Sequence, residues 1–183
     1  MNPDIDRLLQ AAIAAADNAY APYSNFYVGA ALLLDDGSIV TGANFENASY
    51  GMTLCAETVA IAKANSDGQL MQIVAIAVAG GLTGKIGASA EAITPCGRCR
   101  QILKEVADLV HRDLPVHCAC AGGYDTHLLS EFCRTALALP TSNKKARNVH
   151  SIRHLDPRAS KQYRHDRAVR RSTAPRRLYQ LRP

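Results

Sequence analysis

Apolar side chains recur at helical spacing near the start of the chain and in short, nearly continuous runs further along. The first pattern predicts an amphipathic helix that starts at Pro3, with Asn2 as its cap, and ends near Tyr20, before Ala21-Pro22. Its apolar face consists of Ile5, Leu8, Leu9, Ala12, Ile13 and Ala16.

The apolar runs predict strands. Residues 26–34 form the first, and the turn Asp35-Asp36-Gly37 predicts that residues 38–43 return beside it as a hairpin. Residues 71–79 are almost all apolar, which is typical of a strand buried on both faces. The remaining expected elements are helices over residues 55–64 and 97–110, a loop over 80–94, a strand over 116–121 and a turn at 122–123. The order α-β-β-α-β-α-β predicts an α/β domain with a mixed sheet and helices on its faces.

The composition sets limits on size and location. The chain has 183 residues and a mass of 19.7 kDa, enough for one domain whose core needs no disulfides. No apolar run approaches the roughly 20 residues of a membrane span, and the N-terminus lacks the basic-then-apolar order of a signal peptide. We therefore expect a cytoplasmic protein without membrane contact, whose six cysteines serve metal binding, catalysis or burial.

Charge is divided unevenly along the chain. Residues 1–131 contain 14 acidic and 7 basic side chains, whereas residues 132–183 contain 2 acidic and 14 basic ones. The second part shows no apolar period, which predicts a disordered basic tail after a folded domain of residues 1–131. Such a tail opens one alternative, a zinc-stabilised nucleic-acid-binding protein. With two tyrosines for base stacking and no recognisable fold, the tail makes nucleic acid an unlikely partner.

Three of the cysteines have the spacing of a catalytic metal site. Cys55 is expected at the start of one helix, and the pair Cys96 and Cys99 opens the next. Backbone N–H groups and the positive end of the helix dipole stabilise thiolates at such positions. Three protein ligands leave the fourth position of zinc for water, whose pKa the metal lowers toward about 7.

Glu57 follows Cys55 by two residues, too close to be a comfortable further ligand but well placed to move protons of the bound water. Cys-x-Glu followed by Pro-Cys-x-x-Cys is the arrangement of zinc deaminases. The alternative is a closed structural site that adds Cys118 or Cys120. These two flank Ala119 on an expected strand and point the same way, which is more typical of core residues than of ligands.

Together with further motifs, these residues resemble the cytidine deaminases of pyrimidine salvage, of the small homotetrameric type with three cysteine ligands. The matching stretches run in the family's order, from about residue 5 to Glu131. They are residues 19–26 (AYAPYSNF), 28–31 (VGAA), 44–50 (NFENASY), 55–57 (CAE) and 95–101 (PCGRCRQ). The resemblance implies a three-layer α-β-α domain with a mixed five-stranded sheet. It also implies hydrolytic deamination of cytidine and 2′-deoxycytidine to the uridine products.

The resemblance further implies roles for single residues. Zinc would be bound by Cys55, Cys96 and Cys99, and Glu57 would shuttle protons. The substrate would be contacted by Phe26 at the pyrimidine, by backbone groups of Ala56 at the base, and by Asn44 and Glu46 at the ribose hydroxyls. Phe26 also fits a core strand position. A nucleoside-antibiotic deaminase of the blasticidin S type shares the cysteine motifs and is the alternative enzyme, although Asn44 and Glu46 favour cytidine.

Three departures from the family's pattern matter. Thr58 stands where the family commonly has an arginine, which tempers the negative charge of three thiolates around zinc. The loop over residues 80–94 is longer than usual. The family's ending, L-L-P-x-x-F-G-P, does not follow Glu131. Restoring one nucleotide to the gene just after the codon of Glu131 would permit that ending. We therefore interpret residues 132–183 as a shifted reading of the gene, with a natural basic tail as the alternative, and expect a weakened tetramer.

Overall fold

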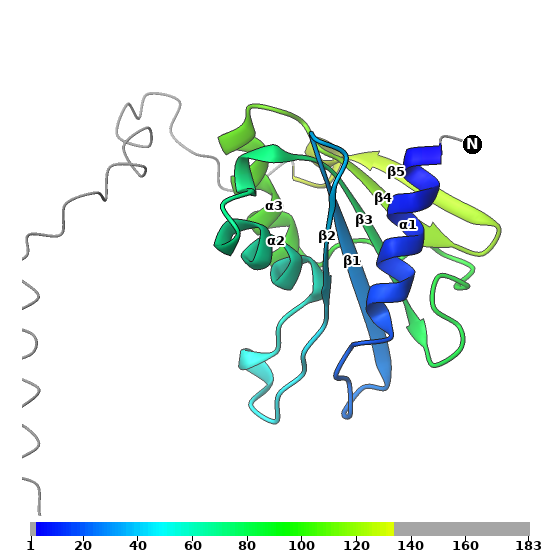
Figure 1. The fold of residues 1–183 in the computed structure, drawn as a ribbon. Coiled ribbons are helices and arrows are strands. Elements are labelled where there is room, and N and C mark those ends of the chain that lie inside the picture. The colour runs from blue at the N-terminus through cyan, green and yellow to red at the C-terminus, as the bar shows by residue number, and fades with distance from the viewer. Residues whose placement is uncertain (1–2, 134–183) are drawn as a thin grey trace, which may run out of the picture. The chain divides into compact units, whose positions relative to one another are not determined.

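The computed structural model describes residues 3–133, in which five strands form one sheet between two layers of helices (Figure 1). The elements are α1 (Pro3–Ala16), β1 (Phe26–Leu34), β2 (Ile39–Ala43), α2 (Ala56–Ser66), β3 (Ile73–Leu82), α3 (Gly97–Val110), β4 (Pro115–Cys120), β5 (Gly123–Leu128) and α4 (Leu129–Phe132). Short 3-10 turns lie at Tyr50–Met52 and Leu70–Gln72. The predictions of a disordered tail and a shifted reading frame concern residues outside this range, apart from Phe132 and Cys133.

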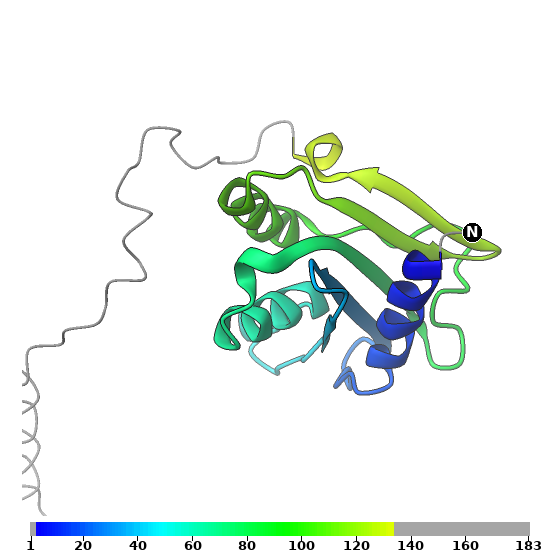
Figure 2. The same ribbon diagram turned by 45° about the horizontal axis from the view of Figure 1, so that its top comes forward.

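The sheet is mixed, with the strand order β2-β1-β3-β4-β5. Strands β3 and β4 run parallel, and every other pair of neighbours is antiparallel. Helix α1 covers one face, and α2 and α3 cover the other (Figure 2). This arrangement confirms the predicted three-layer α-β-α domain. Within residues 3–133, no helix has the length and apolar character needed to cross a bilayer.

Strand β3 is buried on both faces, as its apolar run predicted. Ile76 and Val78 pack toward α2 and α3, and the smaller Ala75 and Ala77 pack toward α1. A strand that contributes to two cores has to be apolar at every position, which explains why alternation is absent from its sequence.

Two glycines let the helices approach the sheet backbone. At Gly29 of β1, a Cβ atom would lie 2.0 Å from the carbonyl oxygen of Ala12 in α1. At Gly42 of β2, on the opposite face, it would lie 2.4 Å from the amide nitrogen of Ala60 in α2. Since no real side chain tolerates such distances, glycine at position 42 fixes how closely α2 lies on the sheet.

Helix α1 ends at Ala16, four residues before the predicted end near Tyr20. The reason is a long-range contact. The N–H of Tyr20 donates to the carbonyl of Asn44 at 3.0 Å, and the N–H of Glu46 donates to the carbonyl of Tyr20 at 2.8 Å. The chain therefore leaves the helix early and runs beside the segment that follows β2.

Two strands also differ from the pattern. Strand β3 continues to Leu82, because residues 80–82 pair with the start of β1. Strand β5, implied by the resemblance but not by periodicity, has the polar sequence GYDTHL and lies at the edge of the sheet, where most of its side chains are exposed. An edge strand of this kind carries no buried face to mark it in the sequence.

Candidate active site

Three cysteine thiols meet where α2 and α3 begin. Cys55 and Cys96 are the N-cap residues of these helices, and Cys99 lies in the first turn of α3. Their sulfur atoms lie within 4.8 Å of one another, and the Sγ atoms of Cys55 and Cys96 are 3.8 Å apart. Tetrahedral zinc with Zn–S bonds of about 2.3 Å requires sulfur atoms about 3.8 Å apart. The cluster therefore fits the metal in both donor type and size.

The other cysteines do not join this cluster. Within residues 3–133, Cys55, Cys96 and Cys99 form the one group of three or more His, Cys, Asp or Glu side chains with metal-ligand spacing. Cys118 lies in the core beneath α2 and α3, where burial raises the pKa of its thiol to about 12. Cys120 is half-buried at the end of β4. This argues against a closed four-cysteine site.

The thiols differ in their protonation. A hydrogen bond with Cys99 lowers the pKa of the Cys55 thiol to about 6, and the contact with Cys96 and the charge of Arg98 act in the same direction. The same hydrogen bond, together with burial, raises the pKa of Cys99. The thiolate form is therefore favoured at Cys55 over Cys99. Because zinc binds thiolates, metal binding releases the protons that these thiols still carry.

Glu57 reaches the cluster from the first turn of α2. Its side chain is 4% exposed, and burial raises the pKa of its carboxyl group. Cys99 contacts it through a hydrogen bond that acts weakly in the opposite direction. Raising the pKa of a carboxyl group brings it closer to neutral pH, which suits it better than an ordinary exposed carboxylate to accepting a proton and passing it on.

The family follows from comparison with known proteins. The sequence profile described as "Cytidine and deoxycytidylate deaminase zinc-binding region" matches residues 3–111. The chain belongs to this deaminase family. Its cofactor is therefore zinc, for which the three thiols provide a fitting site.

Relatives of the deaminase family cover most of the described domain. A cytidine deaminase of Halalkalibacterium halodurans is 48% identical over 103 residues, which are 56% of this chain and 72% of the relative. One of Mycobacterium tuberculosis is 47% identical over 105 residues, 56% of this chain and 73% of the relative. The crystal structure of cytidine deaminase from Burkholderia pseudomallei superposes with a TM-score of 0.63 at 39% identity, covering 72% of this chain and 98% of that one.

The two side chains predicted to bind ribose lie beside the start of β1. The amide of Asn44 accepts a hydrogen bond from the N–H of Val28 at 2.8 Å and donates to the carbonyl of Phe26 at 3.0 Å. Each amide atom keeps capacity for one further partner. Glu46 accepts hydrogen bonds from the N–H of Tyr23 at 3.0 Å and from the hydroxyl of Ser24 at 2.6 Å, which lower the pKa of its carboxyl group.

Phe26 and Ala56 lie on the same side of the sheet as the thiols. The half-buried ring of Phe26 lies beside Gly80 of β3. A Cβ atom added at Gly80 would lie 3.2 Å from the Cε1 atom of Phe26. Ala56 is buried as the first residue of α2, and N–H groups at that position have no partner within the helix. The structure thus brings the predicted base-contacting residues to the helix-covered face that holds Cys55.

Thr58, where the family commonly has arginine, contacts a predicted metal ligand. Its hydroxyl oxygen lies 3.8 Å from the sulfur of Cys99. Of the two arginines in the first turn of α3, Arg98 is the one whose charge lowers the pKa of Cys55. Near the thiols, this chain therefore has the hydroxyl of Thr58 and the positive charge of Arg98.

Sequence reasoning missed Ser24. Its hydroxyl donates to Glu46 and also accepts a hydrogen bond from the N–H of Phe26 at 3.0 Å, so it joins the two substrate candidates. A serine two residues before the start of a strand is a local signal for such a turn. Its reach to Glu46, however, depends on a contact between segments 22 residues apart.

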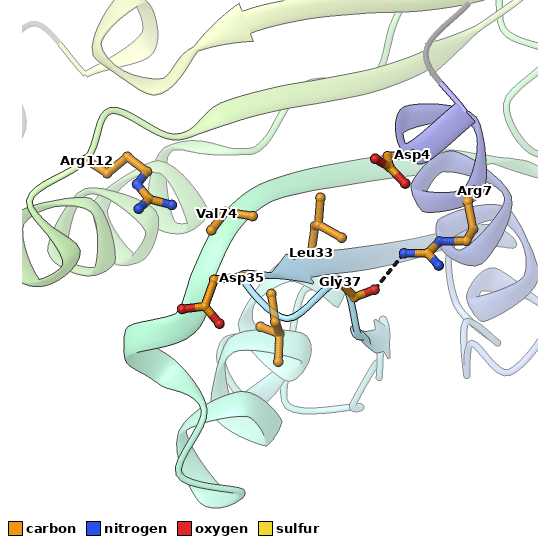
Figure 3. A pocket seen from close by; sticks show the side chains of 8 residues that line it. Asp4, Arg7, Leu33, Asp35, Gly37, Val74 and Arg112 are labelled. Carbon is orange, nitrogen blue, oxygen red and sulfur yellow. Dashed lines mark hydrogen bonds between the residues drawn. The ribbon is translucent and has the colours of Figure 1, made fainter.

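A hollow of about 400 Å³ lies at the other end of the sheet (Figure 3). Arg7 and Arg112 lie at its two sides, and Arg7 donates to the carbonyl oxygen of Gly37 at 2.6 Å. The lining includes Asp4 and Asp35 but no residue of the deaminase motifs. The hollow is thus separate from the predicted site.

Proposed function

We propose that this protein is a zinc-dependent cytidine deaminase, which converts cytidine and 2′-deoxycytidine into uridine and 2′-deoxyuridine with release of ammonia, in pyrimidine salvage. One observation carries the proposal: three thiols of suitable spacing at two helix starts, with the buried carboxyl group of Glu57 beside them. The names of the relatives agree with it.

Cys55, Cys96 and Cys99 would hold the metal. Bound zinc would act as a Lewis acid and lower the pKa of a water molecule toward about 7. Glu57 takes a proton from the water, donates it to N3 of the pyrimidine, and then assists protonation of the departing amine. The net change replaces the amino group on C4 by oxygen, so water is the only co-reactant.

The residues around β1 would hold the nucleoside. Phe26 would lie against the pyrimidine, and the N–H of Ala56 would bind the base. Asn44 and Glu46 would hydrogen-bond the ribose hydroxyls while they hold the start of β1 and residues 23–24. Because a buried amide and carboxylate are costly to leave unpaired, they would disfavour ligands without sugar hydroxyls, whereas 2′-deoxycytidine still offers its 3′- and 5′-hydroxyls.

A homotetramer is part of the proposal. Large apolar side chains near the predicted substrate site are exposed, namely Tyr20, Tyr23, Phe45, Tyr50 and Met52. Neighbouring exposed aromatic residues are typical of surfaces that a partner covers. Because the chain after Glu131 departs from the family's ending, we expect this tetramer to be weakened. Light scattering on the zinc-loaded chain measures the subunit number: a stable, fully active tetramer would contradict the weakening, and a fully active monomer would contradict the tetramer.

We place the protein in the cytoplasm, because all six of its cysteines are free and thiolate ligands persist in reducing compartments. We also propose that residues 1–131 are the catalytic domain and that residues 132–183 come from a shifted frame. Sequencing the gene around codons 131–133 tests this: a reproducible read that encodes this chain would exclude a sequencing artefact.

The function is tested by incubating the zinc-loaded chain with cytidine, 2′-deoxycytidine and blasticidin S in parallel. We expect conversion of both nucleosides and none of the antibiotic, and loss of activity after removal of zinc by a chelator. Turnover of blasticidin S alone would favour the alternative enzyme, for which a Bacillus cereus blasticidin-S deaminase, 32% identical over 81 residues, is a relative. A zinc-loaded chain that deaminates none of the three would contradict the proposal.

A further inference from the structure

We propose that Arg100 is a positioning residue of the metal centre, which fixes the loop that carries Cys96. The inference builds on the zinc site of the proposed function. Cys99 is held inside α3 and fully buried, whereas Cys96 is an exposed N-cap residue. The chain before it, from residue 83 to residue 96, contains no helix or strand. Something other than regular secondary structure has to hold Cys96 in place.

Arg100 supplies that restraint from the first turn of α3. Its side chain turns back along the helix, and Nε donates to the carbonyl of Pro95 at 2.7 Å. Nη2 of the same guanidinium donates to the hydroxyl oxygen of Thr94 at 3.2 Å. Its backbone N–H donates to the carbonyl of Cys96 at 2.9 Å. The side chain thus holds two consecutive residues at the end of the loop, and the backbone bond to Cys96 is the ordinary first bond of the helix.

Two residues after Glu131, which under the proposed frame shift are specific to this chain, add contacts to this arginine. The guanidinium carbon of Arg100 lies 4.7 Å from the centre of the Phe132 ring, at the end of α4. The thiol of the next residue, Cys133, donates to the backbone carbonyl of Arg100 at 3.5 Å. The Phe132 ring also packs against His127, with 4.9 Å between the ring centroids. Helix α4 therefore limits the orientations that the guanidinium adopts.

Arg98 makes a weaker contact of the same kind. It donates to the carbonyl of Thr53, two residues before Cys55, at 3.2 Å, but its side chain is exposed and makes one such bond. Both cysteines accept the first backbone bond of their helix, from Val59 to Cys55 at 3.1 Å and from Arg100 to Cys96 at 2.9 Å. The two side-chain bonds of Arg100, against one of Arg98, are why we expect the larger effect at Arg100.

The geometry of the side chain matters more than its charge. A planar guanidinium reaches two acceptors at once and stacks on a ring, whereas a lysine ammonium is a point donor on a flexible stem. Outer-shell partners of metal ligands typically change metal affinity about 10- to 100-fold when they are replaced. We therefore expect Arg100→Met to weaken zinc binding about tenfold or more and Arg100→Lys to recover part of that loss.

The test measures zinc affinity of the full chain by competition with a chromophoric chelator, and the melting temperature with and without zinc. The variants are Arg100→Met, Arg100→Lys and Phe132→Leu. Lys104→Met is the matched control, because Lys104 lies one turn further along α3 and pairs with Asp108 rather than with the loop. Affinity and the zinc-induced rise in melting temperature should fall most in Arg100→Met, less in Arg100→Lys and Phe132→Leu, and not in Lys104→Met.

Two results would overturn the proposal. One is a zinc affinity of Arg100→Met equal to that of Lys104→Met. The other is an equal loss of melting temperature in the metal-free and zinc-loaded forms, which would indicate a role in folding alone. If Arg100→Met does not fold, Arg100→Lys and Phe132→Leu decide by the same criteria. No step of this test uses cytidine, so it gives its result whether or not the unchanged chain proves to be a cytidine deaminase.

Discussion

Glu46 and Glu57 are almost equally buried, with 6% and 4% of their surfaces exposed, yet their pKa values shift in opposite directions. Glu46 accepts hydrogen bonds from the Ser24 hydroxyl and from backbone N–H groups of residues 23 and 24, which favour its charged form. Burial disfavours the charged form of Glu57 and outweighs the hydrogen bonds that it receives. The hydrogen-bond donors around Glu46 and the stronger desolvation of the Glu57 carboxyl group therefore together separate the two groups.

The difference matches the tasks proposed for the two halves of the site. A carboxylate that stays charged is a constant acceptor for hydroxyl groups of a ligand. A carboxyl group whose charged form is poorly stabilised is suited to exchanging protons with its surroundings. Variants of these two residues should consequently fail in different ways.

The largest effect is expected for Glu57→Gln, which keeps the shape of the side chain but cannot carry the proton. We expect kcat for cytidine to fall at least about a hundredfold, with zinc content and melting temperature close to those of the unchanged chain. Glu105→Gln, an exposed glutamate of α3, is the control and should change neither. Full activity in Glu57→Gln would remove Glu57 from the mechanism.

A smaller and different effect is expected for Glu46→Gln. The Tyr23 N–H and the Ser24 hydroxyl both donate to the carboxylate of Glu46. The glutamine side chain has an NH₂ group in place of one oxygen, so one of these two hydrogen bonds is lost. The proposed bond from a ribose hydroxyl would also lose its charged acceptor, so we expect the KM for cytidine to rise roughly 10- to 100-fold with zinc binding unaltered.

Asp36→Asn is the matched control for that variant. Asp36 also accepts a hydrogen bond from a backbone N–H, that of Ser38 at 2.8 Å, and its carboxyl pKa is also lowered, but it lies in the β1–β2 turn. Steady-state kinetics should show no change in KM for Asp36→Asn. A loss of zinc in Glu46→Gln would show that the two halves of the site are not independent.

The smallest effect concerns stability in acid. Folding lowers the carboxyl pKa of Glu46 below its ordinary value of 4.5, so the stabilisation it provides is complete above that value. It is lost as the pH falls through the lower, folded-state pKa. Urea unfolding over roughly pH 6 to pH 3 should therefore show a steeper loss of stability in the unchanged chain than in Glu46→Gln. Equal slopes would contradict the contribution of Glu46.

The proposed metal-binding half of the site rests on more local sequence patterns than the proposed sugar-binding half. Cys55, Cys96 and Cys99 lie at helix starts, and both a helix start and a Cys-x-x-Cys pair are local patterns. The β1–β2 hairpin and the doubly buried β3 were equally local predictions, and the structure confirms them.

What the sequence could not predict depends on contacts between distant segments. The end of α1 at Ala16 follows from the pairing of Tyr20 with Asn44 and Glu46. The hydrogen bonds of Asn44 to β1 and the reach of Arg100 to Pro95 are of the same kind, since they depend on which backbone groups tertiary folding brings close. Periodicity carries no information on such partners.

The spacing of Cys55 and Cys96 has a consequence for the stability of the folded chain. The two sulfur atoms are 3.8 Å apart in space but 41 residues apart in sequence, and each precedes a different helix. A metal ion shared by them acts as a removable cross-link that closes a long loop. Covalent closure of a loop of this length is worth about 4 kcal/mol in chain entropy. Bound zinc would thus raise the free energy of unfolding of this chain as well as supply its chemistry.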